Sequence, residues 1–319
     1  MAKILVTGAA GFIGSNLVER LLDLKNVVIG VDNFDPFYSR DIKQQNLQGL
    51  LRHPGFSFYE FDLGEAGNIE TITEPIDIVV HLAGKAGVRP SIDDPNGYIK
   101  ANITATNNIL EWMQKRNIKK LVFASSSSVY GNNKKVPFEE TDLVDNPISP
   151  YAFTKKACEL LNHVYHSLYK MDIINLRFFT VYGPRQRPDL AIHKFVKMID
   201  NNIPLTVYGD GSTARDYTFV EDTVSGIISS IEFVSRNINV FEVVNLGNST
   251  PVKLLDLINH IYTIMDKEPQ IEYLPMQPGD VDITYASIDK ATKLINYNPQ
   301  TPIEAGLKKF VEWYRSHKK

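Results

Sequence analysis

Short apolar runs alternate with stretches of helical periodicity along the first 180 residues. The runs are typical of strands buried on both faces of a sheet, and the stretches between them repeat apolar residues every three or four positions. We expect strands at 4–6, 27–31, 56–61, 76–81, 120–124 and 173–178, with helices near 96–116 and 150–170. Repeated β-α-β units of this kind predict a parallel sheet covered by helices on both faces.

The rhythm changes after Phe179, where Gly-Pro, Arg-Pro and Gly-Asp-Gly turns interrupt the chain. Helices are expected beyond this point at 189–201, 220–233, 253–265 and 302–316, with one strand at 241–246 that returns to the main sheet. The last part of the chain therefore resembles a smaller, mixed unit. A cleft between this unit and the carboxyl edge of the sheet is the expected place for a substrate.

Three glycines follow the first apolar run at intervals of three residues: Gly8, Gly11 and Gly14 in KILVTGAAGFIG, residues 3–14. In a strand–turn–helix unit, one glycine permits the tight turn, one lets the backbone approach a pyrophosphate, and one lets the helix pack closely. The free N–H groups of the helix, which includes Phe12 and Ile13, would bind the phosphates. Glycine spacing alone equally fits a turn with no ligand.

Asp32 follows the second apolar run and favours the dinucleotide interpretation. It stands about 20 residues after the glycines, where an acid meets the ribose hydroxyls. A carboxylate also repels a 2′-phosphate, so NAD is favoured over NADP. The pattern predicts an α/β fold, a Rossmann-type doubly wound parallel sheet with a smaller mixed α/β substrate-binding lobe. We assign residues 1–178 with 214–246 to the NAD-binding domain, and 179–213 with 247–319 to the lobe.

Composition excludes several other classes of protein. The 319 residues are 43% hydrophobic and 22% charged, which is enough for a large core. A net charge of −3 without a basic stripe argues against nucleic acid, and no apolar run is long enough to cross a membrane. The histidines lack metal-ligand spacing, so we expect no metal. Cys158 is the single cysteine, which excludes an internal disulfide, and no signal peptide is recognisable, so we expect a cytoplasmic protein.

A tyrosine and a lysine four residues apart, Tyr151 and Lys155, would share one face of a helix. Ser149 and Pro150 suit the N-cap and first position of that helix. The same spacing recurs in Tyr130/Lys134 and Tyr314/Lys318, so spacing alone does not decide among the three pairs. Context favours Tyr151, because it follows a serine run, 125–128, that ends an expected strand.

The chemistry of an oxidation explains this combination. An unperturbed tyrosine has a pKa near 10 and is a poor base at neutral pH, but a nearby ammonium favours its anion. Lys155 would supply that ammonium, and Tyr151 would take a proton from a hydroxyl as hydride leaves the same carbon for NAD. Ser126 would hydrogen-bond the reacting oxygen. Turn formation and helix capping are the alternative role for the serines.

In these motifs and their order, the sequence resembles the extended short-chain dehydrogenases/reductases, in the sugar-nucleotide epimerase/dehydratase branch. The matching pieces run nearly end to end: TGAAGFIG (7–14), VDN (31–33), FDL (61–63), HLAG (81–84), SSSSVYG (125–131), SPYAFTK (149–155), RFFTVYGP (177–184) and ARDYTFVED (214–222). The resemblance implies NAD as cofactor and a UDP-sugar as substrate. It also implies a homodimer built on the helices near 96–116 and 150–170, with Trp112 and Tyr165 as candidate anchors. The alternative for either residue is a place in the core of its own subunit.

The resemblance also implies roles for individual residues. The catalytic residues are Ser126, Tyr151 and Lys155. The cofactor-binding residues are Gly8, Gly11, Phe12, Ile13, Gly14, Asp32, Asn33, Asp62, Leu63, Leu82, Ala83, Lys85, Asn102, Ser125, Tyr151, Lys155 and Phe178. The substrate-binding residues are Ser126, Ser127, Ser128, Thr180, Arg187, Arg215 and Asp280. For Arg187 the alternative is a pair with Asp189, and for Arg215 a pair with a neighbouring aspartate.

Three segments, 86–103, 177–191 and 273–281, resemble UDP-glucuronate 4-epimerases in particular. Lys85 departs from that pattern, since these enzymes commonly carry glutamine there. Ser127 and Ser128 stand where related dehydratases carry an Asp-Glu pair, which disfavours elimination of water. The expected reaction is 4-epimerisation of UDP-glucuronate. The alternatives are 4-epimerisation of UDP-glucose or UDP-N-acetylglucosamine, a simple alcohol dehydrogenase, and a silent NAD-binding scaffold.

Overall fold

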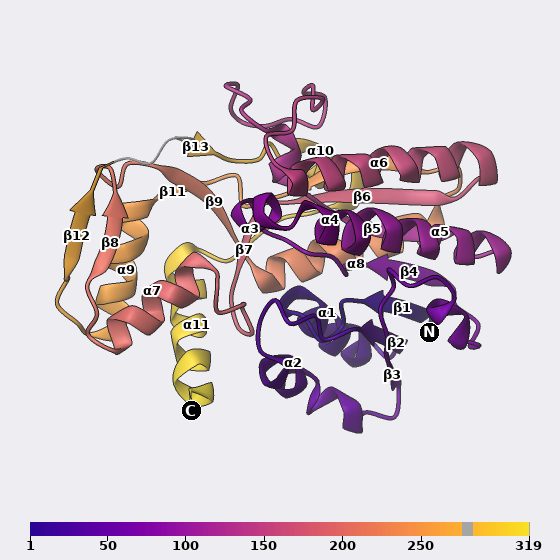
Figure 1. Cartoon of the computed structure of the whole chain (residues 1–319), viewed down its shortest axis with the longest axis horizontal. Coiled ribbons are helices and arrows are strands. Elements are labelled where there is room, and N and C mark those ends of the chain that lie inside the picture. The colour runs from indigo at the N-terminus through magenta and orange to yellow at the C-terminus, as the bar shows by residue number, and fades with distance from the viewer. Residues whose placement is uncertain (276–282, 319) are drawn as a thin grey trace.

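The computed structural model describes residues 1–275 and 283–318, and its largest unit is a seven-stranded sheet (Figure 1). The strands are ordered β10-β6-β5-β4-β1-β2-β3 and all pair in parallel. Their bounds are β1 Lys3–Thr7, β2 Val27–Asp32, β3 Phe56–Glu60, β4 Ile78–His81, β5 Lys120–Ser126, β6 Asp172–Phe178 and β10 Phe241–Leu246. The chain winds outward from β1 in both directions, so the doubly wound parallel sheet is confirmed.

Helices cover both faces of this sheet, as the alternation of buried side chains requires. Val6 belongs to the core that contains residues of α1 and α8, whereas its neighbour Leu5 belongs to the core that contains residues of α5 and α6. The helices are α1 Phe12–Asp23, α2 Arg40–Leu47, α3 Val88–Asp93, α4 Pro95–Tyr98, α5 Ala105–Lys115, α6 Pro150–Tyr169, α7 Ala191–Asp200, α8 Val220–Arg236, α9 Leu254–Met265, α10 Asp289–Ile295 and α11 Ile303–His317. Short 3-10 turns are η1 Leu50–Arg52, η2 Asn68–Thr71 and η4 Ser127–Tyr130.

The single helix expected near 96–116 is instead α4, a π-helical segment η3 (Ile99–Thr104) and α5. Asn102 lies in η3, and its amide nitrogen donates to the carbonyl of Lys85 at 3.1 Å and to the hydroxyl of Thr154 at 2.9 Å. Its amide oxygen accepts from the Lys85 N–H at 2.8 Å. A π turn inserts an extra residue and is frequent at functional sites. Here it ties the end of β4 to α6.

The smaller lobe contains two short sheets. One joins β7 (Thr180–Tyr182), β9 (Ala214–Phe219), β11 (Pro251–Lys253) and β13 (Ile283–Thr284), and the other pairs β8 (Leu205–Tyr208) with β12 (Ile271–Leu274). Figure 1 shows β8, β12, α7 and α9 to one side of the main sheet, with β7 and β9 between. β9 pairs with lobe strands, although the sequence-based division assigned it to the NAD-binding domain. The strand expected at 241–246 is β10, which returns to the main sheet.

Trp112, expected as an interface anchor, is only 1% exposed and packs in the core of its own subunit. Tyr165 is also buried. The apolar side chains that α6 leaves in solvent are instead Phe153, Leu160, Val164 and Leu168. Trp112 and Tyr165 are therefore buried residues rather than surface anchors, and α6 carries a separate stripe of exposed apolar side chains.

Over residues 1–275 and 283–318, no helix is long and apolar enough to cross a membrane. In the same residues, no group of three or more His, Cys, Asp or Glu side chains is placed to hold a metal ion. Cys158 is buried inside α6, consistent with a packing role.

Candidate active site

The glycine turn lies at the switch point of the sheet, where β1 adjoins β4 and the chain winds away in opposite directions. Gly8 follows β1 with a φ of +70°, and a Cβ there would lie 2.9 Å from the backbone nitrogen of Ala83 after β4. A Cβ on Gly14 would lie 2.0 Å from the carbonyl oxygen of Gly8. Only glycine fits at these two positions, so helix α1 packs directly on the turn.

Helix α1 begins at Phe12, with Gly11 as an N-cap that supplies no side-chain hydrogen bond. The first-turn N–H groups, including those of Phe12 and Ile13, therefore receive no capping side chain. Free donors at a helix N-terminus behind a glycine cradle suit a diphosphate. The expected pyrophosphate-binding residues thus have the required geometry.

Asp32 ends β2, and its carboxylate is held beside the glycine turn. One oxygen accepts from the N–H of Phe34 at 2.8 Å and the other from the N–H of Ala10 at 3.2 Å. The ammonium of Lys43 in α2 lies 3.7 Å from the first oxygen, and both side chains are 7% exposed. No motif indicated Lys43, because its role depends on how α2 folds back over β2. The acid expected to bind ribose hydroxyls is thus at the correct edge of the sheet.

The other expected cofactor residues follow β2, β3 and β4, end β6, or lie in η3. Asp62 accepts from the N–H of Gly64 at 2.7 Å, and the N–H of Ala83 donates to Thr7 at 3.1 Å. Leu63 and Asn102 are buried, Leu82 and Phe178 are half-buried, and Asn33 is exposed.

Lys85, the departure from the glucuronate-type pattern, joins two acids from different segments. Its ammonium lies 3.0 Å from Asp94, the N-cap of α4, and 3.9 Å from Asp35 in the loop after β2. The lysine side chain is 22% exposed, so these interactions are partly screened by solvent. Lys85 therefore links the loop after β2 to the segment after β4.

Helix α6 begins as its sequence predicts and aims two catalytic candidates at the sheet. The Ser149 hydroxyl accepts from the N–H of Ala152 at 3.1 Å as an N-cap, and Pro150 occupies the first helical position. The ammonium of Lys155 donates to the carbonyl of Ala124 in β5 at 2.8 Å. Tyr151 and Lys155 are both buried, at 9% and 5% exposure. The pair chosen from context therefore lies against the end of β5.

The serine run at the end of β5 divides into different roles. The Ser126 hydroxyl accepts from the N–H of Ser128 at 3.2 Å, and the two hydroxyl oxygens are also 3.2 Å apart. Ser127 and Ser128 are half-buried. The Ser125 hydroxyl instead donates its proton to the buried carboxylate of Glu159 at 2.7 Å, so this hydrogen bond lies inside the core. Glu159 is a second residue that no motif indicated.

Burial shifts the pKa values of both Tyr151 and Lys155, and neighbouring groups oppose the shift at Tyr151. Burial raises the pKa of Tyr151, while hydrogen bonding with Ser126 and the positive charge of Arg187 work in the opposite direction. Burial lowers the pKa of Lys155. The sequence interpretation assigned the stabilisation of the phenolate to Lys155 and missed the contribution of Arg187, which comes from a segment 36 positions later in the chain.

Arg187 forms the pair that the sequence interpretation gave as its alternative role. Its Nε and Nη2 donate to the two oxygens of Asp189 at 2.9 and 2.7 Å. The guanidinium also lies 4.8 Å above the ring of Phe37, and Nη2 is 3.4 Å from the carbonyl oxygen of Ala86. Arg187 thereby brings the loop after β2, the segment after β4 and the start of the lobe together beside Tyr151.

The remaining substrate-binding expectations are placed as follows. Thr180, the first residue of β7, is exposed. Arg215 in β9 is half-buried and its Nη1 donates to the carbonyl of Ala214 at 2.9 Å. Asp280 and most of the 273–281 segment lie outside the described residues.

The rival tyrosines have packing roles. Tyr130 stacks against Phe138 and Phe179, and its hydroxyl donates to Asn245 at 2.7 Å. Tyr314 is 8% exposed in the C-terminal helix α11, with its hydroxyl 3.4 Å from Asp200. Neither belongs to the group formed by Ser126, Tyr151 and Lys155.

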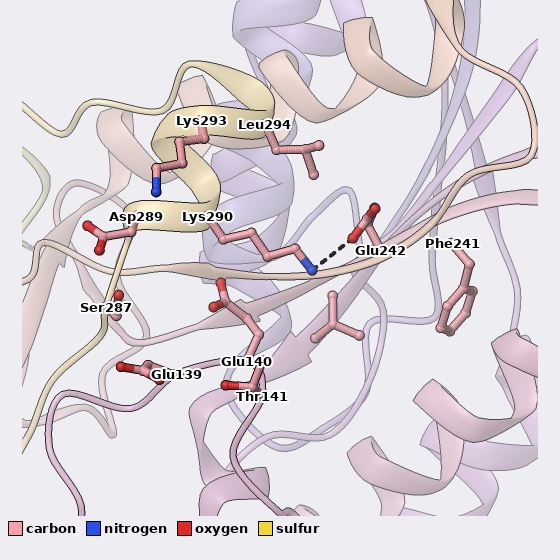
Figure 2. Close-up of a pocket in the computed structure, with 11 residues that line it drawn as sticks. Glu139, Glu140, Thr141, Phe241, Glu242, Ser287, Asp289, Lys290, Lys293 and Leu294 are labelled. Carbon is pink, nitrogen blue, oxygen red and sulfur yellow. Dashed lines mark ion pairs between the residues drawn. The ribbon is translucent and has the colours of Figure 1, made fainter.

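A hollow of about 640 Å³ lies elsewhere, at the outer edge of the sheet beside β10 (Figure 2). Its walls carry charges of both signs, including the ammonium of Lys290, 2.8 Å from the carboxylate of Glu242. None of its lining residues belongs to the predicted active site.

Comparison with known proteins agrees with this geometry. A model of the NAD dependent epimerase/dehydratase family matches residues 4–247. A UDP-glucuronate 4-epimerase of Thermodesulfobacterium geofontis is 42% identical over 320 residues, covering 99% of this chain and 97% of the relative.

Solved structures give the same result. The UDP-glucuronic acid 4-epimerase of Bacillus cereus, in complex with UDP-glucuronic acid and NAD, is 37% identical and superposes with a TM-score of 0.92 over 98% of this chain and 99% of that one. A UDP-N-acetylglucosamine 4-epimerase of Methanobrevibacter ruminantium M1, in complex with UDP-N-acetylmuramic acid, is 32% identical with a TM-score of 0.90, covering 99% of each chain.

Proposed function

The chain belongs to the NAD-dependent epimerase/dehydratase family and is a sugar-nucleotide epimerase of that family, and from this premise we propose that it interconverts UDP-glucuronate and UDP-galacturonate. The observation that carries the proposal is the end of β5, where the half-buried Ser127 and Ser128 directly follow Ser126, whose hydroxyl lies 3.2 Å from that of Ser128 and hydrogen-bonds with Tyr151. These hydroxyls can hold a carboxylate, and neither titrates at neutral pH.

The reacting carbon is C4 of the sugar. NAD, when bound, accepts the hydride of the C4–H bond and later returns it. Tyr151 removes the proton of the C4 hydroxyl, and Ser126 holds the same oxygen by a hydrogen bond. Burial raises the pKa of Tyr151, and the hydrogen bond with Ser126 and the positive charge of Arg187 oppose that rise without cancelling it. We assign Lys155, one helical turn after Tyr151 on α6, to supply a further positive charge to the phenolate. The 4-keto sugar would then rotate and be reduced on its other face, and Tyr151 would return its proton to the C4 oxygen.

The sugar carboxylate must be fixed during the keto stage. A β-keto acid loses CO₂ when its carboxylate stands perpendicular to the carbonyl plane. We assign Ser127, Ser128 and Thr180 to hold the carboxylate through hydroxyl donors, and Arg187 to supply a charged fork after exchange with Asp189. A serine at position 128 cannot protonate the carbanion that decarboxylation would leave.

The nucleotide is assigned to the lobe. Arg215 in β9 is in register with Thr284 of β13, so the two side chains lie close together at one sheet edge. Arg215 would bind the diphosphate, and the small Thr284 would leave room for the sugar. UDP-glucose and UDP-N-acetylglucosamine are the alternative substrates, and related epimerases carry names for both.

We also assign a homodimer, formed through α6. Phe153, Leu160, Val164 and Leu168 recur along this helix and are 46–66% exposed. Burying such a stripe against a second copy would remove apolar surface from water. Light scattering at micromolar concentration should give twice the mass of the 36.0 kDa chain, and a monomer would contradict this assignment.

Retention of NAD separates an epimerase from the other activities. An epimerase needs the same reduced cofactor for the return hydride, so NAD should copurify and turnover should need none added. The supernatant of the denatured protein is assayed for NAD and compared with the protein concentration. A protein that loses NAD on dilution and then consumes it stoichiometrically would be a dehydrogenase, and one that turns over no UDP-sugar would be a binding scaffold.

A further inference from the structure

A buried carboxylate lies next to the residue assigned to the diphosphate. Asp216 is 0% exposed, and its described hydrogen-bond partners are neutral donors. Oδ1 accepts from the Asn248 N–H at 2.6 Å and the Thr218 hydroxyl at 3.3 Å, and Oδ2 accepts from the N–H groups of Ser249 and Ala286 at 3.0 Å each. Burial raises the pKa of Asp216, and these donors work against that rise. Burying a carboxylate costs free energy unless hydrogen-bond donors are held in place around it.

The three backbone N–H donors come from two segments that are distant in sequence from Asp216. Asn248 and Ser249 precede β11, and Ala286 follows β13. A Cβ on Gly247 would lie 2.6 Å from Oδ2 of Asp216 and 2.6 Å from the Cβ of Ala286, so the backbone closes tightly around the carboxylate. The Asp216 side chain in β9 thus holds the backbone segments that adjoin both flanking strands, β11 and β13.

β9 and one of its flanking strands, β13, carry the positions that we assign to the substrate. Arg215, adjacent to Asp216, is in register with Val252 of β11 on one side and Thr284 of β13 on the other. Arg215 and Asp216 point to opposite faces of the strand, because side chains alternate along it. The buried carboxylate of Asp216, on one face of β9, therefore sets the positions of Arg215 on the other face and of Thr284.

We propose that Asp216 is a positioning residue that sets Arg215 and Thr284 for the diphosphate and the sugar of the substrate. The proposal rests on the proposed function, since it requires a UDP-sugar in the lobe. Its chemical basis is that asparagine, of the same size, would replace one accepting oxygen with an NH₂ group. That group would face a backbone N–H, so one of the two segments must move away.

A purely structural role would lower stability without changing the affinity of the folded protein. Asp172 is the matched control, because it is also buried and accepts a backbone N–H, from Val240 at 2.9 Å. It begins β6 and therefore lies at the amino-terminal ends of the parallel strands, whereas the active site lies at their carboxyl ends. Asp172→Asn and Asp216→Asn are therefore compared in the NAD-loaded enzyme.

The test is isothermal titration of each folded variant with UDP, accompanied by NAD content, thermal midpoint and KM. For Asp216→Asn we expect affinity for UDP to fall about 10- to 100-fold and KM for the UDP-sugar to rise similarly, the range in which small displacements act. NAD content should stay at the wild-type level. Asp172→Asn should lower the thermal midpoint and leave UDP affinity unchanged. Wild-type UDP affinity in Asp216→Asn would overturn the inference.

Two further variants keep the outcome decisive. If Asp216→Asn does not fold, Thr218→Val removes one donor at nearly constant volume and should weaken UDP binding roughly threefold or more, and unchanged binding overturns the inference. If Arg215→Met loses UDP while Asp216→Asn keeps it, the positioning role fails and the proposed function stands. If the wild-type enzyme binds no UDP, both fail.

Discussion

The two carboxylate oxygens of Glu159 each accept a hydrogen bond from Arg177, from Nε and Nη2, at 2.9 Å. Both side chains are 2% exposed. Glu159 stands one helical turn after Lys155 on α6, and Arg177 in β6 is in register with Ser125 of β5. The ion pair therefore fixes the helix that carries Tyr151 to the two strands that end at the active site.

Replacement of Arg177 by methionine should destabilise the fold strongly. It would leave Glu159 buried with the Ser125 hydroxyl and one partly exposed cation, Lys156, and breaking a buried pair costs about 3–5 kcal/mol. Urea unfolding at pH 7 measures the change. The control is Arg236→Met, since its pair with Glu232 is 76% and 55% exposed and should contribute less than about 1 kcal/mol. Equal losses in both variants would contradict the account.

The same pair predicts a dependence of stability on pH. Burial raises the pKa of Glu159, but Arg177 and the Ser125 hydroxyl outweigh it and hold the pKa below its ordinary value of 4.5. A carboxyl group whose pKa is lower in the folded protein than in the unfolded chain stabilises the fold at pH values above its unfolded-state pKa. This stabilisation is lost as the pH falls through its folded-state pKa. Glu159→Gln should lose stability at neutral pH and show a flatter decline on acidification. Parallel pH profiles for the two proteins would refute the assignment.

Replacement of Tyr151 by phenylalanine should remove catalysis and spare the fold. Only the ionisable oxygen is deleted, and loss of a general base typically lowers kcat about 10²- to 10⁴-fold. NAD content and the thermal midpoint should remain near wild type. Tyr130→Phe and Tyr314→Phe should retain kcat, because both tyrosines have packing contacts. A larger loss of kcat in either control would show that the wrong tyrosine was chosen.

Replacement of Arg187 by methionine should weaken binding of the uronate sugar more than binding of the nucleotide. If its guanidinium binds the sugar carboxylate, KM for UDP-glucuronate should rise roughly 10- to 100-fold, as for loss of charged hydrogen bonds, while affinity for UDP is unchanged. Arg185→Met is the control, because Arg185 is close in sequence and pairs with Glu19 at 2.8 Å. An unchanged KM would assign Arg187 to its pair with Asp189 alone.

Sequence patterns predicted the elements whose local signals agree with their burial. The run Phe241–Leu246 has apolar residues at both ends and two adjacent β-branched valines, and it is strand β10 with the expected bounds. Ser149-Pro150 begins α6 as its capping chemistry requires. Strands β7, β8 and β9 were not predicted as strands. They are short, lie among turn residues, and are defined by partners far away in the chain.

At the active site, the motifs predicted which residues gather at the sheet edge but not how their charges are paired. Lys43 at Asp32, Glu159 at Ser125 and the Arg187–Asp189 pair each depend on long-range packing. The break of the expected helix at η3 has the same origin. Asn102 bonds to Lys85 and Thr154, and neither is its neighbour in the sequence.

The most direct test of the proposed function is product analysis after incubation with UDP-glucuronate alone. Purified enzyme, with no NAD added, is incubated with UDP-glucuronate, and the nucleotide sugars are separated and identified by mass and NMR spectroscopy. The account predicts UDP-galacturonate as the product, at unchanged mass, approaching the same mixture from either direction. A dominant UDP-pentose with release of CO₂, or turnover of UDP-glucose with none of UDP-glucuronate, would contradict it.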